Sequence, residues 1–301
     1  MGDFDRGSNR WPFPKRCRRL FVAVFALVGT ASLMLLSLES LPQLPNSGSI
    51  RLLGKFIGGS IQPALDYEDK GATAFSIPFL SKVVLSLIET LRFAVLGVSL
   101  AMIVGLVVGF LSTTSNWSNP RVQAPNWTRN LFARTIGRGA QLMARLVGIV
   151  ARSTHELLWA VFLMAAIGNG PLTAVLAIAI PYTGAFSKIF AEIVEEMPPS
   201  VATSYQSLGS PPLQTFCFAI LPQALPELLG YSLYRLEAGI RSSAIMGFFG
   251  IPTIGYYLRL SWDNTHYREV WSYLYALLFL LTCFDLASGV VRKGLTSKSK
   301  T

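Results

Sequence analysis

Residues 93–111 read FAVLGVSLAMIVGLVVGFL, a run of 19 residues without a charged side chain. An α-helix rises about 1.5 Å per residue, so this run matches a hydrocarbon layer about 30 Å thick. A second uncharged run of equal length, LFVAVFALVGTASLMLLSL, occupies residues 20–38. Two such runs predict helices that span a lipid bilayer.

Further apolar stretches continue this pattern along the chain. They cover residues 157–167, 172–186, 216–233 and 271–284. The stretch at 157–167 is too short to span a bilayer alone, and a helix that enters from about residue 140 would lengthen it. Only 14% of the residues are charged, against roughly 25% in soluble domains. We therefore expect an all-α integral membrane protein with about six transmembrane helices.

The distribution of charge predicts the orientation of these helices. Basic residues exceed acidic ones in residues 1–19, in residues 112–152 and from Arg292 onward, whereas residues 39–82 carry four of each sign. Basic loops tend to face the cytoplasm. We expect both termini and the segment 112–140 in the cytoplasm and the 39–82 loop outside. The net charge of +10 then reflects lipid headgroups and topology, and we expect no nucleic-acid partner.

Residues with catalytic or metal-binding chemistry are scarce. The three cysteines, Cys17, Cys217 and Cys283, form no C-x-x-C pair, and two histidines without an H-E-x-x-H motif offer little for a zinc site. The phosphate-binding motif G-x-x-x-x-G-K-[ST] is absent from the sequence. We expect no metal, no cofactor and no catalytic residues in this chain.

A proline-rich stretch, SLGSPPLQTFCFAILPQALPELLGYSLYRLE at residues 207–237, interrupts the apolar pattern. Gly209 favours the left-handed conformation that ends a helix, and Pro211 and Pro212 suit the first turn of the next helix. Apolar residues recur at helical spacing on both sides: Val201, Tyr205 and Leu208 before, Leu213, Phe216, Cys217 and Ile220 after. This pattern predicts a broken helical element on the cytoplasmic side, which either docks in a groove of a soluble partner or is an ordinary interfacial loop.

This element resembles the cytoplasmic signature of permease subunits of bacterial ABC importers. That signature reads Glu-Ala-Ala, three residues, Gly, nine residues, Ile, one residue and Leu-Pro. Gly209, Leu221 and Pro222 occupy its Gly and Leu-Pro positions. Its other positions hold Thr203, Ser204, Tyr205 and Ala219. The resemblance implies that an ATPase subunit contacts this element, and it assigns the coupling role to Tyr205, Leu208, Gly209, Leu213, Leu221 and Pro222.

The flanking segments resemble the permease of phosphonate importers in particular. The resemblance covers roughly residues 85–293, including RSTHELLWAVFLMAAIGNGP at 152–171. Two departures are IPTIG, at residues 251–255, where that family has a glycine-rich run, and Gly239 where Asn is usual. Both bear on which substrate is carried.

The resemblance implies the type I ABC importer permease fold. The chain then divides as follows: a cytoplasmic basic tail (1–19), the first transmembrane helix (20–38), an external loop (39–84), the permease core (85–293) with a cytoplasmic coupling segment (197–216), and a second cytoplasmic basic tail (294–301).

Polar residues inside the predicted spans are candidates for the substrate pathway. They are Arg152, His155, Glu156, Arg235, Glu237, Arg241 and Ser242. A charged side chain at the bilayer centre costs about 2.5–3.5 kcal/mol. Charged residues within a span therefore usually have a partner or a function. Arginine can bind a phosphonate or phosphate group through two parallel hydrogen bonds. Alternatively the acids and bases pair between helices and brace a dimer.

Together these features predict a permease subunit of an ATP-driven importer in the bacterial inner membrane. The expected substrate is phosphonate or a related phosphorus oxyanion. The resemblance implies a separate cytoplasmic ATPase subunit, an external substrate-binding protein and a second permease copy, with membrane lipids around them. The alternatives are a permease for another small solute, such as an amino acid or a different oxyanion, a membrane-embedded enzyme, and a scaffold without transport activity.

Overall fold

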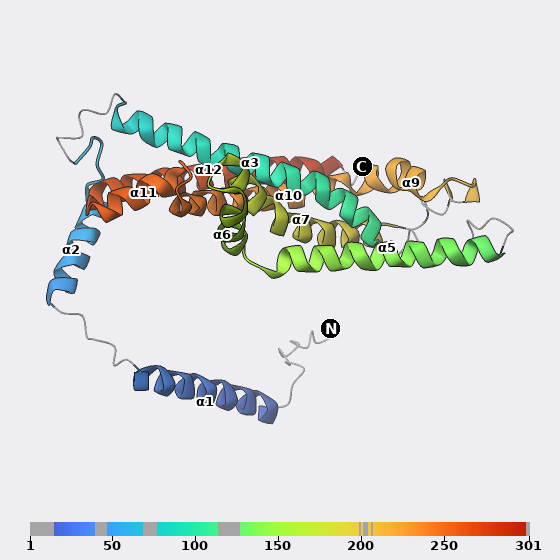
Figure 1. Ribbon diagram of the computed structural model, residues 1–301, viewed down its shortest axis with the longest axis horizontal. Coiled ribbons are helices and arrows are strands. Elements are labelled where there is room, and N and C mark those ends of the chain that lie inside the picture. Colours follow the sequence, from blue (N-terminus) through green and yellow to red (C-terminus); the bar gives the residue numbers. More distant parts are fainter. Residues whose placement is uncertain are drawn as a thin grey trace, which may run out of the picture. The chain divides into compact units, whose positions relative to one another are not determined.

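The computed structural model is almost entirely helical in the part of the chain that it describes (Figure 1). It describes residues 15–39, 47–68, 77–113, 127–198, 200, 204–205 and 207–298. Two compact units are present, residues 1–57 and residues 58–301. The first contains α1 (Lys15–Glu39), and α2 (Ser47–Ile61) crosses from the first unit into the second. The expectation of an all-α protein is confirmed.

The second unit contains the remaining helices. They are α3 (Phe79–Ser112), α5 (Trp127–Ser153), α6 (Glu156–Ile167), α7 (Pro171–Glu196), α9 (Pro212–Thr215), a π-helical turn (Phe216–Ile220), α10 (Leu221–Met246), a 3₁₀ turn (Gly247–Phe249), α11 (Ile254–Asp263) and α12 (Tyr267–Lys298).

Several predicted boundaries shift in the structure. Helix α1 begins within the predicted basic tail, α2 lies inside the predicted external loop, and α3 begins at Phe79 rather than near residue 85. Helix α12 continues into the predicted C-terminal tail as far as Lys298. Residues 1–14 and 299–301 of the two predicted tails lie outside the described residues.

Within the described residues, four helices are long and apolar enough to cross a membrane. They are Phe79–Ser112, Pro171–Glu196, Leu213–Phe249 and Tyr267–Gly294. The pair α5–α6 adds a fifth if it counts as one broken span, and α1 contains a shorter apolar helix, Arg19–Leu35. Four of the six predicted spans therefore meet this test, a fifth does so only if the bent pair α5–α6 counts as one span, and the first predicted span contains only the shorter apolar helix Arg19–Leu35.

A bend of 95° separates α5 from α6, so the helix expected to enter from about residue 140 does not continue straight into 157–167. In Figure 1, α6 runs across the direction of α5. The break arises at His155, whose backbone is extended and whose Nδ1 accepts a hydrogen bond from the Leu157 N–H at 3.3 Å. His155 thus starts a new helix by satisfying one of the free N–H groups at its N-terminus.

Helix α7 packs along α3 and forms the centre of the second unit. Glycines make this close approach feasible: a Cβ on Gly105 would lie 2.5 Å from the Cβ of Phe186, and one on Gly97 would lie 3.0 Å from the Cβ of Ile178. Phe186 and Ile178 are fully buried. Small residues allow membrane helices to pack at short range. The close packing of α3 and α7 therefore holds these two helices together, and the neighbouring helices pack against them.

A turn that contains two glycines leads into α7. Gly168 adopts φ +85°, which glycine reaches readily, and α7 begins at Pro171 with Gly170 before it. The Thr173 hydroxyl donates to the Gly168 carbonyl at 2.6 Å. This turn connects α6 to α7 and thereby sets the start of the helix that carries Tyr182.

Candidate functional site

Three helices bring polar side chains together beside the start of α6. The Ser242 hydroxyl on α10 donates to Glu156 Oε1 on α6 at 2.5 Å, and its oxygen lies 3.0 Å from the Tyr182 hydroxyl on α7. Because Ser242 has a single proton, Tyr182 donates to Ser242 when Ser242 donates to Glu156. Ser242 and Tyr182 are buried, and the Glu156 side chain is 15% exposed. We call Glu156, Tyr182, Ser242 and Arg235 the central polar cluster.

Arg235 joins this cluster through aromatic rings. Its guanidinium lies 5.3 Å from the centre of the Tyr182 ring and 5.5 Å from that of Tyr231. Its Nε also donates to the Tyr231 hydroxyl at 2.8 Å. Such cation–π contacts hold a guanidinium in place while its charge stays uncompensated. Within the described ranges, no carboxylate lies within ion-pair distance of Arg235.

The other predicted pathway residues have different surroundings. Arg241 forms an ion pair with Glu237 at 2.8 Å, one turn away on the same helix. His155 caps α6, and its Nδ1 lies 3.6 Å from Glu156 Oε2. Arg152 lines a separate pocket between α5 and α7. The structure therefore brings together Glu156, Ser242 and Arg235 and places the remaining four outside the central polar cluster.

Tyr182 was missed by the sequence analysis although it joins Ser242 to Arg235. The residue follows Pro181 in an apolar run, where a tyrosine gives no sign of its partners. Its role depends on contacts with α10, which the sequence of α7 alone does not contain. The only signal was a single hydroxyl-bearing ring within a predicted span, and buried tyrosine hydroxyls usually have a hydrogen-bond partner.

The two departures from the phosphonate-permease pattern are packing positions. A Cβ on Gly239 would lie 2.6 Å from Val98 Cγ2, so α10 approaches α3 closely there. In the IPTIG segment, a Cβ on Gly255 would lie 2.0 Å from the Ala244 carbonyl oxygen, and the Ile254 N–H donates to Thr90 Oγ1 at 3.0 Å. Both departures therefore act on helix packing rather than by adding a polar side chain to the central polar cluster.

The predicted coupling segment exposes apolar side chains. The exposed fraction is 84% for Leu208, 59% for Leu213 and 37% for Tyr205. Gly209 has φ +82°, which ends the helical turn before it as expected. Leu221 and Pro222 form the first turn of α10. Residues 199, 201–203 and 206 of this segment lie outside the described residues.

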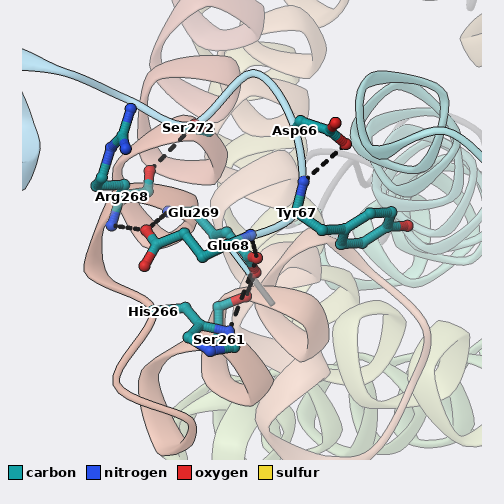
Figure 2. A network of polar contacts seen from close by, with 8 residues as sticks. All are labelled: Asp66, Tyr67, Glu68, Ser261, His266, Arg268, Glu269 and Ser272. Atoms are coloured by element: carbon teal, nitrogen blue, oxygen red, sulfur yellow. Dashed lines mark hydrogen bonds and ion pairs between the residues drawn. The ribbon is translucent and has the colours of Figure 1, made fainter. Parts of the chain in front are cut away.

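A polar network that the sequence analysis did not anticipate connects the segment before α3 to the start of α12 (Figure 2). Glu68 Oε1 accepts hydrogen bonds from the backbone N–H groups of Arg268 at 2.7 Å and Glu269 at 3.2 Å. In return, Glu269 Oε1 accepts from the Glu68 N–H at 2.8 Å, and Glu269 Oε2 accepts from the Ser261 hydroxyl at 2.8 Å. His266 Nδ1 lies 3.7 Å from Glu269 Oε1.

This network, which we call the Glu68–Glu269 clamp, holds a nearly buried carboxylate, since Glu269 is 5% exposed. The carboxylate of Glu68 also satisfies free N–H groups at the N-terminus of α12, where a negative charge is favourable. The sequence signal was slight: a single acid, Glu269, just before the apolar stretch at 271–284. The two carboxylates thereby fix Glu68 to the start of α12 and the start of α12 to Ser261 of α11.

A cavity of about 340 Å³ lies beside the Glu68–Glu269 clamp. The Lys82 ammonium lies 5.3 Å from the centre of the Tyr67 ring and 4.8 Å from that of Tyr257. Burial, followed by the Glu269 carboxylate, raises the pKa of the Tyr67 hydroxyl above its usual value. Among the described residues, no group of three His, Cys, Asp or Glu side chains could hold a metal ion.

Comparisons with known proteins match this architecture. A family described as "Binding-protein-dependent transport system inner membrane component" matches residues 129–298. The phosphite transport system permease protein PtxC of Stutzerimonas stutzeri is 31% identical over 207 residues, which cover 69% of this chain and 69% of that protein. The phosphate-import permease protein PhnE of Mycolicibacterium smegmatis is 28% identical over 214 residues, 71% of this chain and 37% of that protein.

A solved structure shows the same fold at low sequence identity. Inward-facing conformations of the MetNI methionine ABC transporter align with a TM-score of 0.56 and 16% identity, over 71% of this chain and 95% of that chain. At this identity the likeness concerns the fold, which is that of type I ABC importer permeases, as the sequence analysis expected.

Proposed function

This chain belongs to the family of inner-membrane permease components of binding-protein-dependent ABC importers, and from this we propose that it forms the translocation pathway for phosphonate or a related phosphorus oxyanion. The observation that carries the substrate class is the similarity to two permeases named for phosphite and phosphate. The chain is a multi-pass membrane protein and a transport subunit. Its partners within such a system are an ATPase and a substrate-binding protein.

Charge within the spans supports an anionic substrate. Arg241 is neutralised by Glu237 within one helix, whereas Arg235 is held by the rings of Tyr182 and Tyr231. An oxyanion needs basic groups that acids do not already neutralise, and arginine offers it paired donors. Arg235 is therefore the pathway residue that we assign to the substrate in the central polar cluster.

Ser242 and Glu156 have a supporting role in this proposal. A carboxylate repels a phosphorus dianion, so Glu156 orients the hydroxyl groups of Ser242 and Tyr182 instead of binding the substrate. His155 acts through the cap that starts α6 and so positions Glu156. A pathway that contains both signs of charge also releases an anion more easily than a purely basic one.

The exposed leucines of the coupling segment support docking to the ATPase subunit. Leu208, Leu213 and Tyr205 present apolar surface that the described residues leave exposed, and an apolar helical face fits a hydrophobic groove on a partner. Gly209 ends one turn, and Leu221 and Pro222 start α10, so a movement of the docked part is passed to the helix that carries Arg235 and Ser242.

The complete transporter in this proposal contains two copies of the chain, cytoplasmic ATPase subunits and an external binding protein. The basic excess in residues 1–19, in residues 112–152 and after Arg292 supports cytoplasmic termini and contact with anionic lipid headgroups. ATP hydrolysis occurs on the ATPase subunit.

Substrate competition in cells tests the substrate class. A bacterium without its own phosphonate and phosphate importers would receive this chain with the ATPase and binding protein encoded beside it. We expect uptake of labelled methylphosphonate that excess phosphite or phosphate reduces and excess methionine does not. Uptake of methionine with no uptake of phosphorus oxyanions would overturn the proposal and favour a permease for another solute.

A further inference from the structure

Helices α5 and α7 cross closely and leave a pocket beside the crossing. A Cβ on Gly184 would lie 2.5 Å from the Gly148 carbonyl oxygen and 2.8 Å from the Arg152 backbone nitrogen. The pocket has a volume of about 260 Å³. The charged side chains that line it are Arg145, Arg152, Lys188, Glu192 and Glu195.

Two of the three basic side chains in this pocket already have acidic partners. Arg145 lies 3.6 Å from Glu195 and also donates through its Nε to the Ser112 carbonyl at 3.1 Å. Lys188 lies 3.5 Å from Glu192. Arg152 has no carboxylate within ion-pair distance in the part of the chain that the structure describes. The described lining residues thus carry one positive charge in excess, at Arg152.

The position of Arg152 makes this excess unusual. The residue precedes Ser153, the last residue of α5, and the bent pair α5–α6 is apolar enough for a broken span or a re-entrant loop in the membrane. Charged residues within spans are rare and usually face a partner, a ligand or an aqueous cavity. An arginine that lines a pocket and has no acidic partner therefore indicates that the pocket binds an anion.

We propose that this pocket binds a phosphate-type tetrahedral oxyanion at Arg152, with Lys188 as the second cation. The guanidinium of Arg152 supplies paired donors to two oxygens of the anion. Lys188 can turn from Glu192 to the anion at little cost, because both partners are about half exposed (51% and 49%) and exposed ion pairs contribute little stability.

The size of the pocket also suits a small ion. Pockets for drug-sized ligands usually span about 300–1,000 Å³, and this one has about 260 Å³. Two sources offer the same chemistry: the transported oxyanion, in which case the inference rests on the proposed function, or the phosphate group of an anionic lipid headgroup, in which case it does not.

Binding measurements on the full chain, purified with its ATPase subunits, test the site. In the first arm, labelled inorganic phosphate is titrated in maltoside detergent after the lipids have been removed. In the second arm, phosphatidylglycerol is added and the lipid that the complex retains is counted by native mass spectrometry. If the pocket binds free phosphate, we expect Arg152→Gln to weaken phosphate binding about 10- to 100-fold; if it binds a lipid headgroup, we expect the same loss for phosphatidylglycerol. A loss of this size is typical of a charge-assisted hydrogen bond. Arg152→Lys should weaken it less.

Two further variants separate this effect from misfolding. Glu192→Gln removes the acid that competes for Lys188, so we expect severalfold tighter binding, a gain that a damaged fold does not produce. Arg138→Gln removes an exposed arginine from the same helix outside the pocket, and we expect unchanged binding.

Each outcome of the two arms has a distinct meaning. Phosphate binding that depends on Arg152 supports a soluble oxyanion, and retention of phosphatidylglycerol that depends on Arg152 supports a lipid headgroup. If Arg152→Gln changes neither, the proposal is overturned. If cells take up no phosphorus oxyanion but lipid retention still depends on Arg152, the anion site at Arg152 is supported and the proposed transport function is overturned.

Discussion

The hydroxyl of Ser242 connects three helices through a single oxygen atom. It donates to Glu156 on α6, and its oxygen is within hydrogen-bond distance of Tyr182 on α7. Removal of a buried hydrogen-bonding partner costs more than the bond itself, because the groups left behind are still desolvated. Single residues of this kind therefore set the stability of the central polar cluster.

Replacement of this hydroxyl should destabilise the protein measurably. Ser242→Ala leaves Glu156 without this donor and Tyr182 without its acceptor, so we expect a loss of about 1–3 kcal/mol, measured as the unfolding of the purified chain in detergent. Ser232→Ala is the matched control, since Ser232 lies on the same helix and, among the described residues, its hydroxyl bonds only to the Leu228 carbonyl one turn away. Equal stability of the two variants would contradict the structural role of Ser242.

The buried carboxylate of the Glu68–Glu269 clamp leads to a second prediction at this scale. Glu269→Ala leaves the Ser261 hydroxyl and the Glu68 N–H without their acceptor, so we expect a loss of about 3 kcal/mol in the free energy of unfolding, and Glu269→Gln should lose less. The control is Asp263→Ala, whose carboxylate is 60% exposed and pairs with Arg259 at 3.6 Å. Exposed pairs contribute about 0–1 kcal/mol, so a Glu269 variant as stable as the control would be evidence against the clamp.

At the scale of helices, hydropathy predicted α3 because its 19-residue uncharged run matches the bilayer whatever its neighbours are, and it predicted α12 from the shorter apolar stretch at 271–284. The break between α5 and α6 was not predictable in the same way, since histidine is not among the usual helix-capping residues. The pocket at Arg152 depends on the crossing at Gly148 and Gly184, which is a tertiary contact. The pair Glu237–Arg241 needs no tertiary contact, because the two residues lie four positions apart on one helix.

The coupling segment should depend on the conformation of Gly209. A β-branched residue resists φ +82°, so Gly209→Val is expected to shift the preceding turn and to abolish uptake while the chain still inserts into the membrane. Gly230→Val is the matched control. A Cβ at Gly209 or at Gly230 would meet nothing within 4 Å, but of these two glycines only Gly209 has a positive φ. Membrane fractions would measure insertion, and labelled methylphosphonate would measure uptake. Normal uptake in Gly209→Val would rule out this hinge.

At the scale of the whole molecule, the family of the chain and its fold agree with the prediction from sequence, while the substrate rests on relatives and on charge. The residues predicted for the pathway divide into the central polar cluster, an ion pair within α10, the His155 cap and the pocket at Arg152. This division suggests that an anion meets more than one basic position, with Arg235 as the position in the central polar cluster.

ATP-dependent accumulation of methylphosphonate tests the central claim most directly. Vesicles would contain the chain with its ATPase and binding protein, and uptake would be compared between the wild type, Arg235→Gln and the control Arg138→Gln. The account predicts accumulation that requires ATP, falls at least about tenfold in Arg235→Gln, as expected for the loss of a charge-assisted contact, and is unchanged in the control. Absence of accumulation of any phosphorus oxyanion by the assembled wild-type transporter would contradict it.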